Sequence, residues 1–393
     1  MAGLEDRRRS NGSGDDPFLH EYFARFGAPS RGADAPLSIA FLIGSTDISG
    51  GTYVILQHAL HARRSGADVT IVHVYEHRPE FGAWHAALTE LPLVALEDAG
   101  DLQFDIVVAT MWRTVYELPR LRCAHAVYFV QSVESRFYGG TADSWAPPLA
   151  ALTYTFDLPV ITIARWIQAY LAFEHRRPSF LVHNGIRKDL YTPIGPTAAP
   201  DSNTRLRVLV EGPLEVPMKN VEDSIELARS GGADEIWLLT SSDIREHHGV
   251  DRVFSRIPIE QTPAVYRSCG ALLKLSHVEG MYGPPLEMFH CGGTVITYDV
   301  TGHDEFVRDG VNGIVVPMYE RTGVIEAVRT LRDRSDVLRE LRHGALRTAR
   351  AWPDWEQSSS EFFESLRLIA RQPAPDLTHT MLAIRGAASE LPI

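Results

Sequence analysis

Two glutamates in the segment 277–299, HVEGMYGPPLEMFHCGGTVITYD, have the types and spacing that could do chemistry. Glu279 follows an apolar run that predicts a buried strand over 271–276. Glu287 comes after seven further residues, in the first turn of a helix predicted to begin at Pro284. The free backbone N–H groups and the positive dipole at a helix start suit a diphosphate. The structural alternative is that Glu287 only complements the helix dipole and the nearby glycines only turn the chain.

Lysine is rare in this chain, so the place of each lysine is informative. Only three of the 38 basic residues are lysines, namely Lys188, Lys219 and Lys274. Such a skew toward arginine is typical of codon usage. Lys219 lies in the segment EGPLEVPMKN (211–220), directly after a predicted strand.

The elements that must position these residues are short apolar runs that alternate with helical segments from residue 38 onward. Buried strands separated by helices predict parallel sheets that are covered on both faces. Ligands of such sheets bind outside the carboxyl ends of the strands, so a cleft between two facing sheets is the expected site. The predicted strands are 38–43, 68–74, 92–97, 105–110, 126–131, 159–164 and 179–184, then 206–212, 235–241, 253–258, 271–276, 294–299 and 313–317.

We therefore expect two doubly wound α/β domains with short additional segments. Residues 17–27 have one apolar face and no Lys/Arg cluster, which favours a docking helix over a membrane anchor. The predicted parts are an N-terminal tail with this helix (1–36), a first domain (37–186), a Pro-rich linker (187–205), a second domain (206–354), a C-terminal crossover helix (355–371) and a mobile tail (372–393).

Composition excludes several classes of protein. The 393 residues are 45% hydrophobic and 22% charged, which predicts a folded chain long enough for two domains. The formal net charge of −12 argues against nucleic acid as a partner, and neither half of the chain is basic, which argues against an anionic membrane. Three cysteines without paired spacing fit a reducing compartment. No signal peptide or apolar run of about 18 residues is present, so we expect a cytoplasmic protein.

Several common motifs are missing. The loop after the first strand is GSTDISGG (44–51) rather than GxGxxG, and there is no P-loop, no GxSxG and no DxD. Pairs such as His58 and His61, or His247 and His248, lack the carboxylate or cysteine that would complete a metal site. We interpret them as scattered surface histidines and expect no metal.

The spacing Glu-x7-Glu resembles the signature of the retaining glycosyltransferases of family 4, which have the GT-B fold. The resemblance extends in order from about residue 38 to 370. Within that family, YFVQSVESRFY (128–138) and YGPPLEM (282–288) are similar to stretches of bacterial rhamnosyltransferases. The further matching positions are Gly50-Gly51, His183-Asn184-Gly185-Ile186, Gly280, Pro284, Met288, Gly292, Val295, Ile296, Thr301-Gly302-His303-Asp304-Glu305 and Asp309-Gly310-Val311-Asn312-Gly313.

The resemblance implies a role for each matching position. The catalytic residues would be Glu279, near the donor sugar, and Lys219, which would clamp the diphosphate as a point charge. Glu287 would bind the ribose hydroxyls. The backbone of the turn that begins at Gly280 would hold the β-phosphate and the sugar, and the glycine pair after the first strand would let the backbone approach the phosphate. The donor-binding set is Gly50, Gly51, Arg256, Gly280, Met281, Tyr282, Gly283 and Glu287.

The acceptor is expected on the first domain. Aromatic residues in the loops 111–118 and 132–148 could stack on a sugar or aglycone, or could simply pack at the rim of the cleft. The acceptor-binding set is Trp112, Arg113, Gln131, Phe137, Tyr138 and Trp145.

Three departures from the family pattern stand out. Pro213 replaces the arginine of the family's G-R-x(5)-K motif, so one cation is missing; Arg256 or Arg113 could replace it. Gln131 stands where a histidine is common, and glutamine cannot share a proton as imidazole does. The family's E-G-F-G turn is lengthened to E-G-M-Y-G.

The resemblance implies a hexosyltransferase of the GT-B fold that needs no cofactor or metal. It would move a sugar, in particular a deoxyhexose such as rhamnose, from a dTDP, UDP or GDP donor to a hydroxyl of a small-molecule or glycan acceptor, with retention of configuration. A homodimer is compatible with this activity. The alternatives are a non-catalytic sugar-nucleotide-binding module, or a membrane-associated transferase that acts on a lipid-linked glycan.

Overall fold

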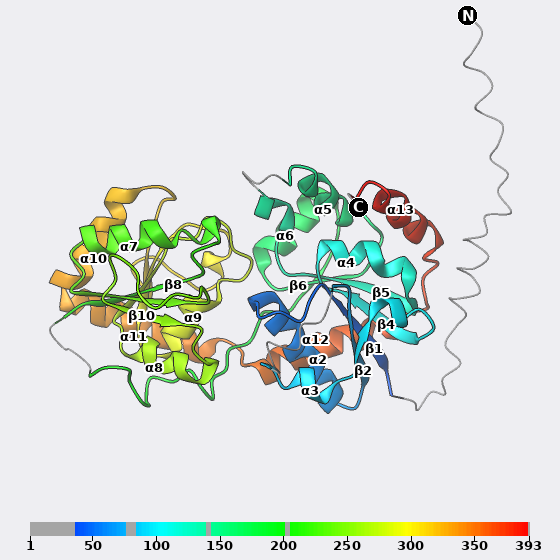
Figure 1. Ribbon diagram of the computed structural model, residues 1–393, viewed down its shortest axis with the longest axis horizontal. Helices are drawn as coiled ribbons and strands as arrows, with labels where there is room; N and C mark the ends of the chain where they lie inside the picture. The colour runs from blue at the N-terminus through cyan, green and yellow to red at the C-terminus, as the bar shows by residue number, and fades with distance from the viewer. Residues whose placement is uncertain (1–35, 76–83, 139–142, 201–204, 392–393) are drawn as a thin grey trace, which may run out of the picture. The chain divides into compact units, whose positions relative to one another are not determined.

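The computed structural model describes residues 36–75, 84–138, 143–200 and 205–391 (Figure 1). The predicted helix over 17–27 lies outside these residues. The chain divides into two compact units. The first contains the described residues up to Phe129, Leu149–Val160 and the described residues from Phe363 onward; the second contains Val130–Pro148 and Ile161–Phe362.

The first sheet has seven strands among the described residues, in the order β3-β2-β1-β4-β5-β6-β7. Its interior strand β1 (SIAFLI) is buried at all six positions, as expected for a strand that is covered on both faces. The strand order reverses direction between β1 and β4, which pair in parallel. The strands are β1 Ser38–Ile43, β2 Asp68–His73, β3 Leu93–Ala95, β4 Gln103–Ala109, β5 Arg122–Val130, β6 Val160–Thr162 and β7 Phe180–Leu181. The helices are α2 Gly50–Arg64, α3 Ala87–Glu90, α4 Trp112–Glu117, α5 Ala146–Thr153 and α6 Arg165–His175.

The second sheet has six parallel strands among the described residues, in the order β10-β9-β8-β11-β12-β13. Alternate residues point to opposite faces. Leu209 and Leu272 pack in one core with residues of α8, α9 and α11, whereas Val208 and Leu273 pack in the other with residues of α7 and α10 (Figure 1). The strands are β8 Arg207–Glu211, β9 Glu235–Thr240, β10 Arg252–Ser255, β11 Ala271–Lys274, β12 Thr294–Tyr298 and β13 Gly313–Val316. The helices are α7 Val221–Ser230, α8 Thr262–Arg267, α9 Gly283–His290, α10 Arg321–Asp333 and α11 Ser335–Ala351.

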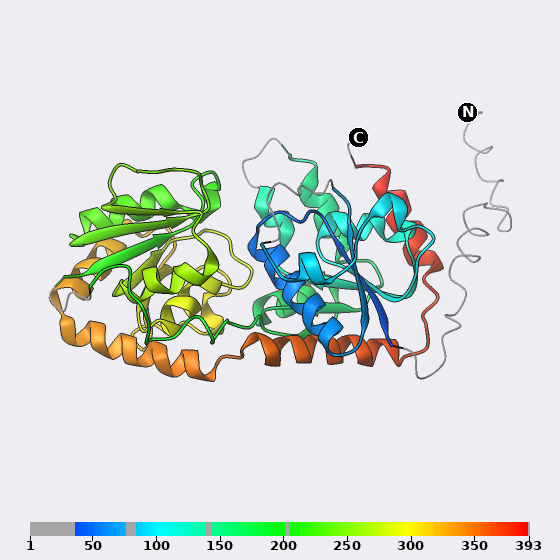
Figure 2. The same ribbon diagram turned by 60° about the horizontal axis from the view of Figure 1, so that its bottom comes forward.

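The C-terminal segment contains a helix that the composition did not predict. The expected crossover helix is α12 (Trp355–Ala370), and its residues from Phe363 onward belong to the first unit. The expectation of a mobile tail over 372–393 is wrong for Thr378–Ala388, which forms α13 and packs beside α4 (Figure 2). Met381 and Ile384 in α13 are fully buried. With Leu377 they recur at i, i+4 and i+7, a helical stripe that the proline and alanine content obscured.

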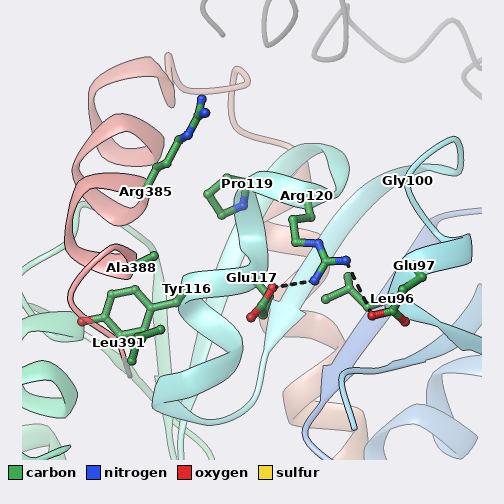
Figure 3. A pocket seen from close by; sticks show the side chains of 10 residues that line it. All are labelled: Leu96, Glu97, Gly100, Tyr116, Glu117, Pro119, Arg120, Arg385, Ala388 and Leu391. Carbon is green, nitrogen blue, oxygen red and sulfur yellow. Dashed lines mark hydrogen bonds and ion pairs between the residues drawn. The ribbon is translucent and has the colours of Figure 1, made fainter. Parts of the chain in front are cut away.

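A cavity of about 530 Å³ lies next to α13 in the first unit (Figure 3). Arg385 and Leu391 line it from the C-terminal segment, and Tyr116 lines it from α4. Arg120, in the 3₁₀ turn after α4, also lines it and pairs with Glu117 at 3.0 Å. The residues that line this cavity include none of the predicted site residues. Among the described residues, no helix is long and apolar enough to cross a membrane.

Candidate active site

Lys219 and Glu279 meet at the carboxyl edge of the second sheet. Lys219 ends the 3₁₀ turn η5 (Pro217–Lys219), which follows β8, and Glu279 follows β11. Because β8 and β11 are parallel neighbours, their carboxyl ends lie at the same edge of the sheet. The Lys219 Nζ lies 2.9 Å from both carboxylate oxygens of Glu279. The side chains are 26% and 7% exposed respectively, so the lysine remains accessible while the glutamate is almost covered.

The loop that carries Lys219 folds back over the strand ends. Gly212 has φ +145°, and a Cβ there would lie 3.1 Å from the Val221 side chain and 3.4 Å from Lys219 Cβ. Glycine is therefore required both by its backbone angle and by the close approach of the loop. The His277 N–H donates to the Met218 carbonyl at 2.8 Å, which ties this loop to the loop that carries Glu279.

A second lysine, Lys274, lies beneath this pair and was not among the predicted site residues. It is 3% exposed, and its Nζ lies 2.6 Å from a carboxylate oxygen of Glu211 and 4.0 Å from one of Glu279. Burial alone would lower the pKa of Lys274, but the two glutamates outweigh it and raise the pKa above its ordinary value. The available signal was a rare lysine inside the apolar strand ALLKLS (271–276).

The carboxylate of Glu279 is held in its ionised form. Burial would raise the pKa of this side chain, but Lys219 and Lys274 together more than reverse that effect. The pKa of Glu279 is therefore lowered. At neutral pH this part of the site holds a buried carboxylate between two ammonium groups.

Glu287 has a different environment although it lies only seven residues beyond. It is partly buried, and it lies beyond the first turn of α9 rather than in it as expected, because the helix begins at Gly283. Burial raises the pKa of Glu287 to about 7. The nearby Glu211 also raises it, whereas hydrogen bonds from Tyr266 and Tyr191 lower it. Tyr191 comes from the predicted linker, where it is 4% exposed and bonded to Thr262 at 2.8 Å. This segment is thus packed onto the core of the second unit.

The turn that begins at Gly280 is held by contacts within the second unit. A Cβ on Gly280 would collide with the carbonyl oxygen of Gln131, so only glycine fits. The indole N–H of Trp166 in α6 donates to the Gly280 carbonyl at 2.8 Å. Tyr282 is fully buried and its hydroxyl donates to the Lys274 carbonyl. Its side chain therefore anchors the turn, and only its backbone is left for a ligand.

Glu305 fixes the helix that carries Trp166. The N-cap residue of α6, Ala164, offers no side-chain acceptor. The carboxylate of Glu305 takes that place and accepts from the backbone N–H of Arg165 at 2.5 Å and of Trp166 at 3.3 Å. His183 Nε2 lies 2.9 Å from the same carboxylate. The sequence indicated this glutamate as a match but did not show that it caps a helix.

The start of α9 offers fewer N–H donors than expected for a helix start. Its first three residues are Gly283, Pro284 and Pro285, and proline has no N–H. The Gly283 N–H donates to the Met281 carbonyl at 3.1 Å. The start of α9 therefore has few free N–H groups to offer to an anion.

The two arginines considered as substitutes for the missing cation are engaged elsewhere. Arg256 is exposed, with its guanidinium 3.0 Å from the Ser241 carbonyl and 3.1 Å from Asp243. Arg113 lies in the first unit, over the Trp112 ring and 3.3 Å from the Tyr75 hydroxyl. Besides Lys219, the cation close to Glu279 is Lys274, whose Nζ lies 4.0 Å from the Glu279 carboxylate.

The remaining predicted residues are divided between the units. Gly50 and Gly51 begin α2 in the first unit, where a Cβ on Gly50 would meet open space. Trp112 is 1% exposed and packs edge-on against Tyr116, so its ring is a core element and does not offer a face to an acceptor. Gln131, Phe137, Tyr138 and Trp145 are partly buried and belong to the second unit.

The histidines need one correction. His58 was expected on the surface, but it is fully buried and packs edge-on against Phe129. Burial lowers its pKa to about 3, so it is a neutral core residue. Among the described residues, no group of three or more His, Cys, Asp or Glu side chains is arranged to hold a metal ion.

Comparisons with known proteins show what this chain is similar to. Residues 217–351 match the family model described as glycosyl transferases group 1. No curated protein sequence matches the chain. Among solved structures, HepE of Anabaena is similar with a TM-score of 0.66 and 15% identity over 84% of this chain and 100% of its own. Sucrose-phosphate synthase from Thermosynechococcus elongatus has a TM-score of 0.65 and 16% identity over 84% and 99%. WaaG, a glycosyltransferase involved in lipopolysaccharide biosynthesis, has a TM-score of 0.64 and 14% identity over 83% of this chain and 99% of its own.

These comparisons confirm the expected GT-B fold. The segment that matches the group 1 glycosyltransferase model contains Lys219, Lys274, Glu279 and Glu287. The narrower likenesses to family 4 and to rhamnosyltransferases stay predictions.

Proposed function

We propose that this chain transfers a glycosyl group from a nucleotide diphosphate sugar to a hydroxyl of a small-molecule or glycan acceptor, with retention of configuration. The observation that carries the proposal is the Lys219–Glu279 pair at the carboxyl edge of the second sheet, inside the segment that matches the group 1 model. HepE, which shares the fold, was solved in complexes with UDP and with UDP-glucose, which makes UDP the first nucleotide to test.

Lys219 supplies positive charge to the leaving diphosphate. It is the more exposed partner of its ion pair, so a ligand can reach its Nζ. Charge that develops on the leaving oxygen is stabilised by a cation already in place, which lowers the barrier to departure. The sequence has no DxD motif, and the proposal assigns this role to lysine without a metal.

Glu279 and Glu287 have different surroundings, and we assign them different roles. Glu279 is ionised and lies at the ammonium group that would bind the diphosphate, so it is positioned to accept a hydrogen bond from a hydroxyl of the donor sugar. Glu287, flanked by two tyrosines, would accept from the vicinal hydroxyls of the ribose. The sugar would be a deoxyhexose such as rhamnose if the second likeness holds.

The reaction we propose avoids a covalent glycosyl-enzyme. The bond from the anomeric carbon to the diphosphate oxygen breaks with its electron pair on the leaving group, and the acceptor oxygen bonds to the same face of the sugar. The acceptor proton passes to the departing phosphate oxygen. A double displacement would need two carboxylates about 5 Å apart around the reacting bond, and the proposal assigns Glu287 to the ribose and Glu211 to Lys274 instead.

The test is to incubate the purified chain with UDP-, dTDP- and GDP-sugars and a panel of hydroxyl acceptors, and to follow nucleotide release. Anomeric proton NMR of the product then reports retention or inversion. Binding of a nucleotide diphosphate without turnover on any donor would favour the non-catalytic module. An inverted product would contradict the retaining assignment.

A further inference from the structure

Lys274 is a buried cation in a strand that is otherwise apolar. It is 3% exposed, and its Nζ contacts the Glu211 carboxylate at 2.6 Å and the Glu211 carbonyl at 3.2 Å. A lysine in such a place would lose its proton if it had no anionic partner. The ion pair with Glu211 explains how Lys274 keeps its charge. It does not explain why an ion pair is buried at this position.

The second contact of Lys274 points to the site. Its Nζ lies 4.0 Å from the Glu279 carboxylate, on which Lys219 forms its two contacts. The backbone carbonyl of Lys274 also accepts from the Tyr282 hydroxyl, so the strand end and the turn after Glu279 are joined. Glu279 is 7% exposed and therefore needs a cation to remain ionised.

Donor binding changes this charge balance. A diphosphate brings negative charge to Lys219, the accessible ammonium, and competes with Glu279 for it. If Lys219 were the only cation, Glu279 would then be a buried carboxylate without a counter-charge and would take up a proton. A protonated Glu279 could not serve as an anionic acceptor.

We propose that Lys274 is a positioning residue that keeps Glu279 ionised when Lys219 turns to the donor diphosphate. This inference rests on the proposed function. The arginine that the family places near the diphosphate is Pro213 here, and Arg256 and Arg113 are engaged elsewhere. The chain thus keeps two ammonium groups at this edge by burying the second one under Glu279.

The direct test follows the titration of Glu279 without any substrate. In Lys219→Met the first cation is absent, which imitates its transfer to the donor. Glutamate side chains labelled with ¹³C are titrated by NMR in Lys219→Met and in Lys219→Met/Glu211→Gln/Lys274→Met, with the Glu279 signal assigned by its loss in Glu279→Gln. The triple variant removes both charges of the buried pair, so no buried charge of that pair is left uncompensated, and Lys219→Met/Glu211→Gln reports the effect of Glu211 alone.

We expect the pKa of Glu279 to be higher by about one unit or more in the triple variant than in both controls. Equal pKa values in the triple variant and Lys219→Met/Glu211→Gln would overturn the role of Lys274. This measurement of the Glu279 pKa does not depend on turnover. Failure of the proposed function would be seen separately, as a wild-type chain that neither binds a nucleotide diphosphate nor releases one from a donor.

A kinetic arm tests the same inference in the active protein. The acid limb of kcat against pH should move to higher pH by about one unit in Glu211→Gln/Lys274→Met, because Glu279 then holds its proton to a higher pH. Lys274→Arg, which keeps the charge, should restore most of the wild-type profile. Lys188→Met, which changes the third lysine of the chain, is the matched control and should leave the profile unchanged. A wild-type acid limb in the double variant would contradict the proposal.

Discussion

The Lys219 ammonium holds both carboxylate oxygens of Glu279 at 2.9 Å, and both residues lie at the carboxyl edge of the second sheet. Lys219 is the more accessible of the two lysines at this edge, and its ammonium is thus already paired with the neighbouring glutamate. In the proposed function, a donor diphosphate would replace that glutamate as the partner of Lys219. The pair would then link the strength of donor binding to the charge of Glu279.

Glu279→Gln should separate binding from transfer. The amide keeps the shape of the side chain but no longer competes for Lys219, so affinity for a nucleotide diphosphate should be kept or increase. The rate of transfer should fall at least tenfold, because a neutral side chain no longer stabilises the donor sugar in the transition state. Calorimetric titration and kcat measure the two effects; full activity of Glu279→Gln would remove this residue from the site.

Gly280→Ala should destabilise the chain and reduce activity, because the new Cβ collides with the Gln131 carbonyl and backbone must move. Overpacking of this kind costs about 1–3 kcal/mol. Gly283→Ala is the matched control in the same turn, since a Cβ there meets nothing within 4 Å. Thermal unfolding of the two variants should show a clear loss only for Gly280→Ala, and equal midpoints would contradict the tight turn.

Glu287 should make the stability of the chain depend on pH. Its pKa of about 7 in the folded chain is above the ordinary value of 4.5. The folded state therefore holds a proton that the unfolded state releases, and stability from this group is full below pH 4.5 and is lost as the pH rises through 7. When the pH is raised from 5 to 8, the free energy of unfolding of wild type should therefore fall relative to that of Glu287→Gln by on the order of 2 kcal/mol. Urea unfolding at the two pH values measures this; parallel curves for both proteins would contradict the assignment.

Met381→Ala should show that α13 is part of the folded first unit. Met381 is fully buried, and replacing such a side chain with alanine costs about 2–5 kcal/mol. His379→Ala, two residues earlier and exposed, is the control. An unchanged unfolding midpoint in Met381→Ala would mean that the helix does not pack as described.

The sequence was sufficient to predict most of the strands and helices, because buried parallel strands such as SIAFLI and ALLKLS are continuous apolar runs with clear ends. It was not sufficient for α13, since three buried residues spaced along one face of a short helix are a weak signal beside prolines and alanines. His58 was misplaced for a similar reason: a polar residue type was assumed to be exposed, yet it lies on the buried face of α2.

The candidate site was predicted in part. Glu279 and Lys219 are 60 residues apart, and it was the family resemblance that assigned them to one site, where the structure shows them in contact. Lys274 and Glu211 were missed because a strand pattern shows that a lysine is buried but does not show which carboxylate of a neighbouring strand lies beside it. The lost donors of Pro284 and Pro285 could have been read from the sequence, since proline has no N–H.

The assignment of a diphosphate site to the Lys219–Glu279 pair is tested by calorimetric titration of UDP into wild type, Lys219→Met and Lys188→Met. Wild type and Lys188→Met should bind UDP equally, whereas Lys219→Met should bind it at least tenfold more weakly while it remains folded. Equal binding by Lys219→Met and wild type would contradict this assignment. If wild type does not bind UDP, the same titration is made with dTDP and GDP, and failure of wild type to bind any of the three would equally contradict it.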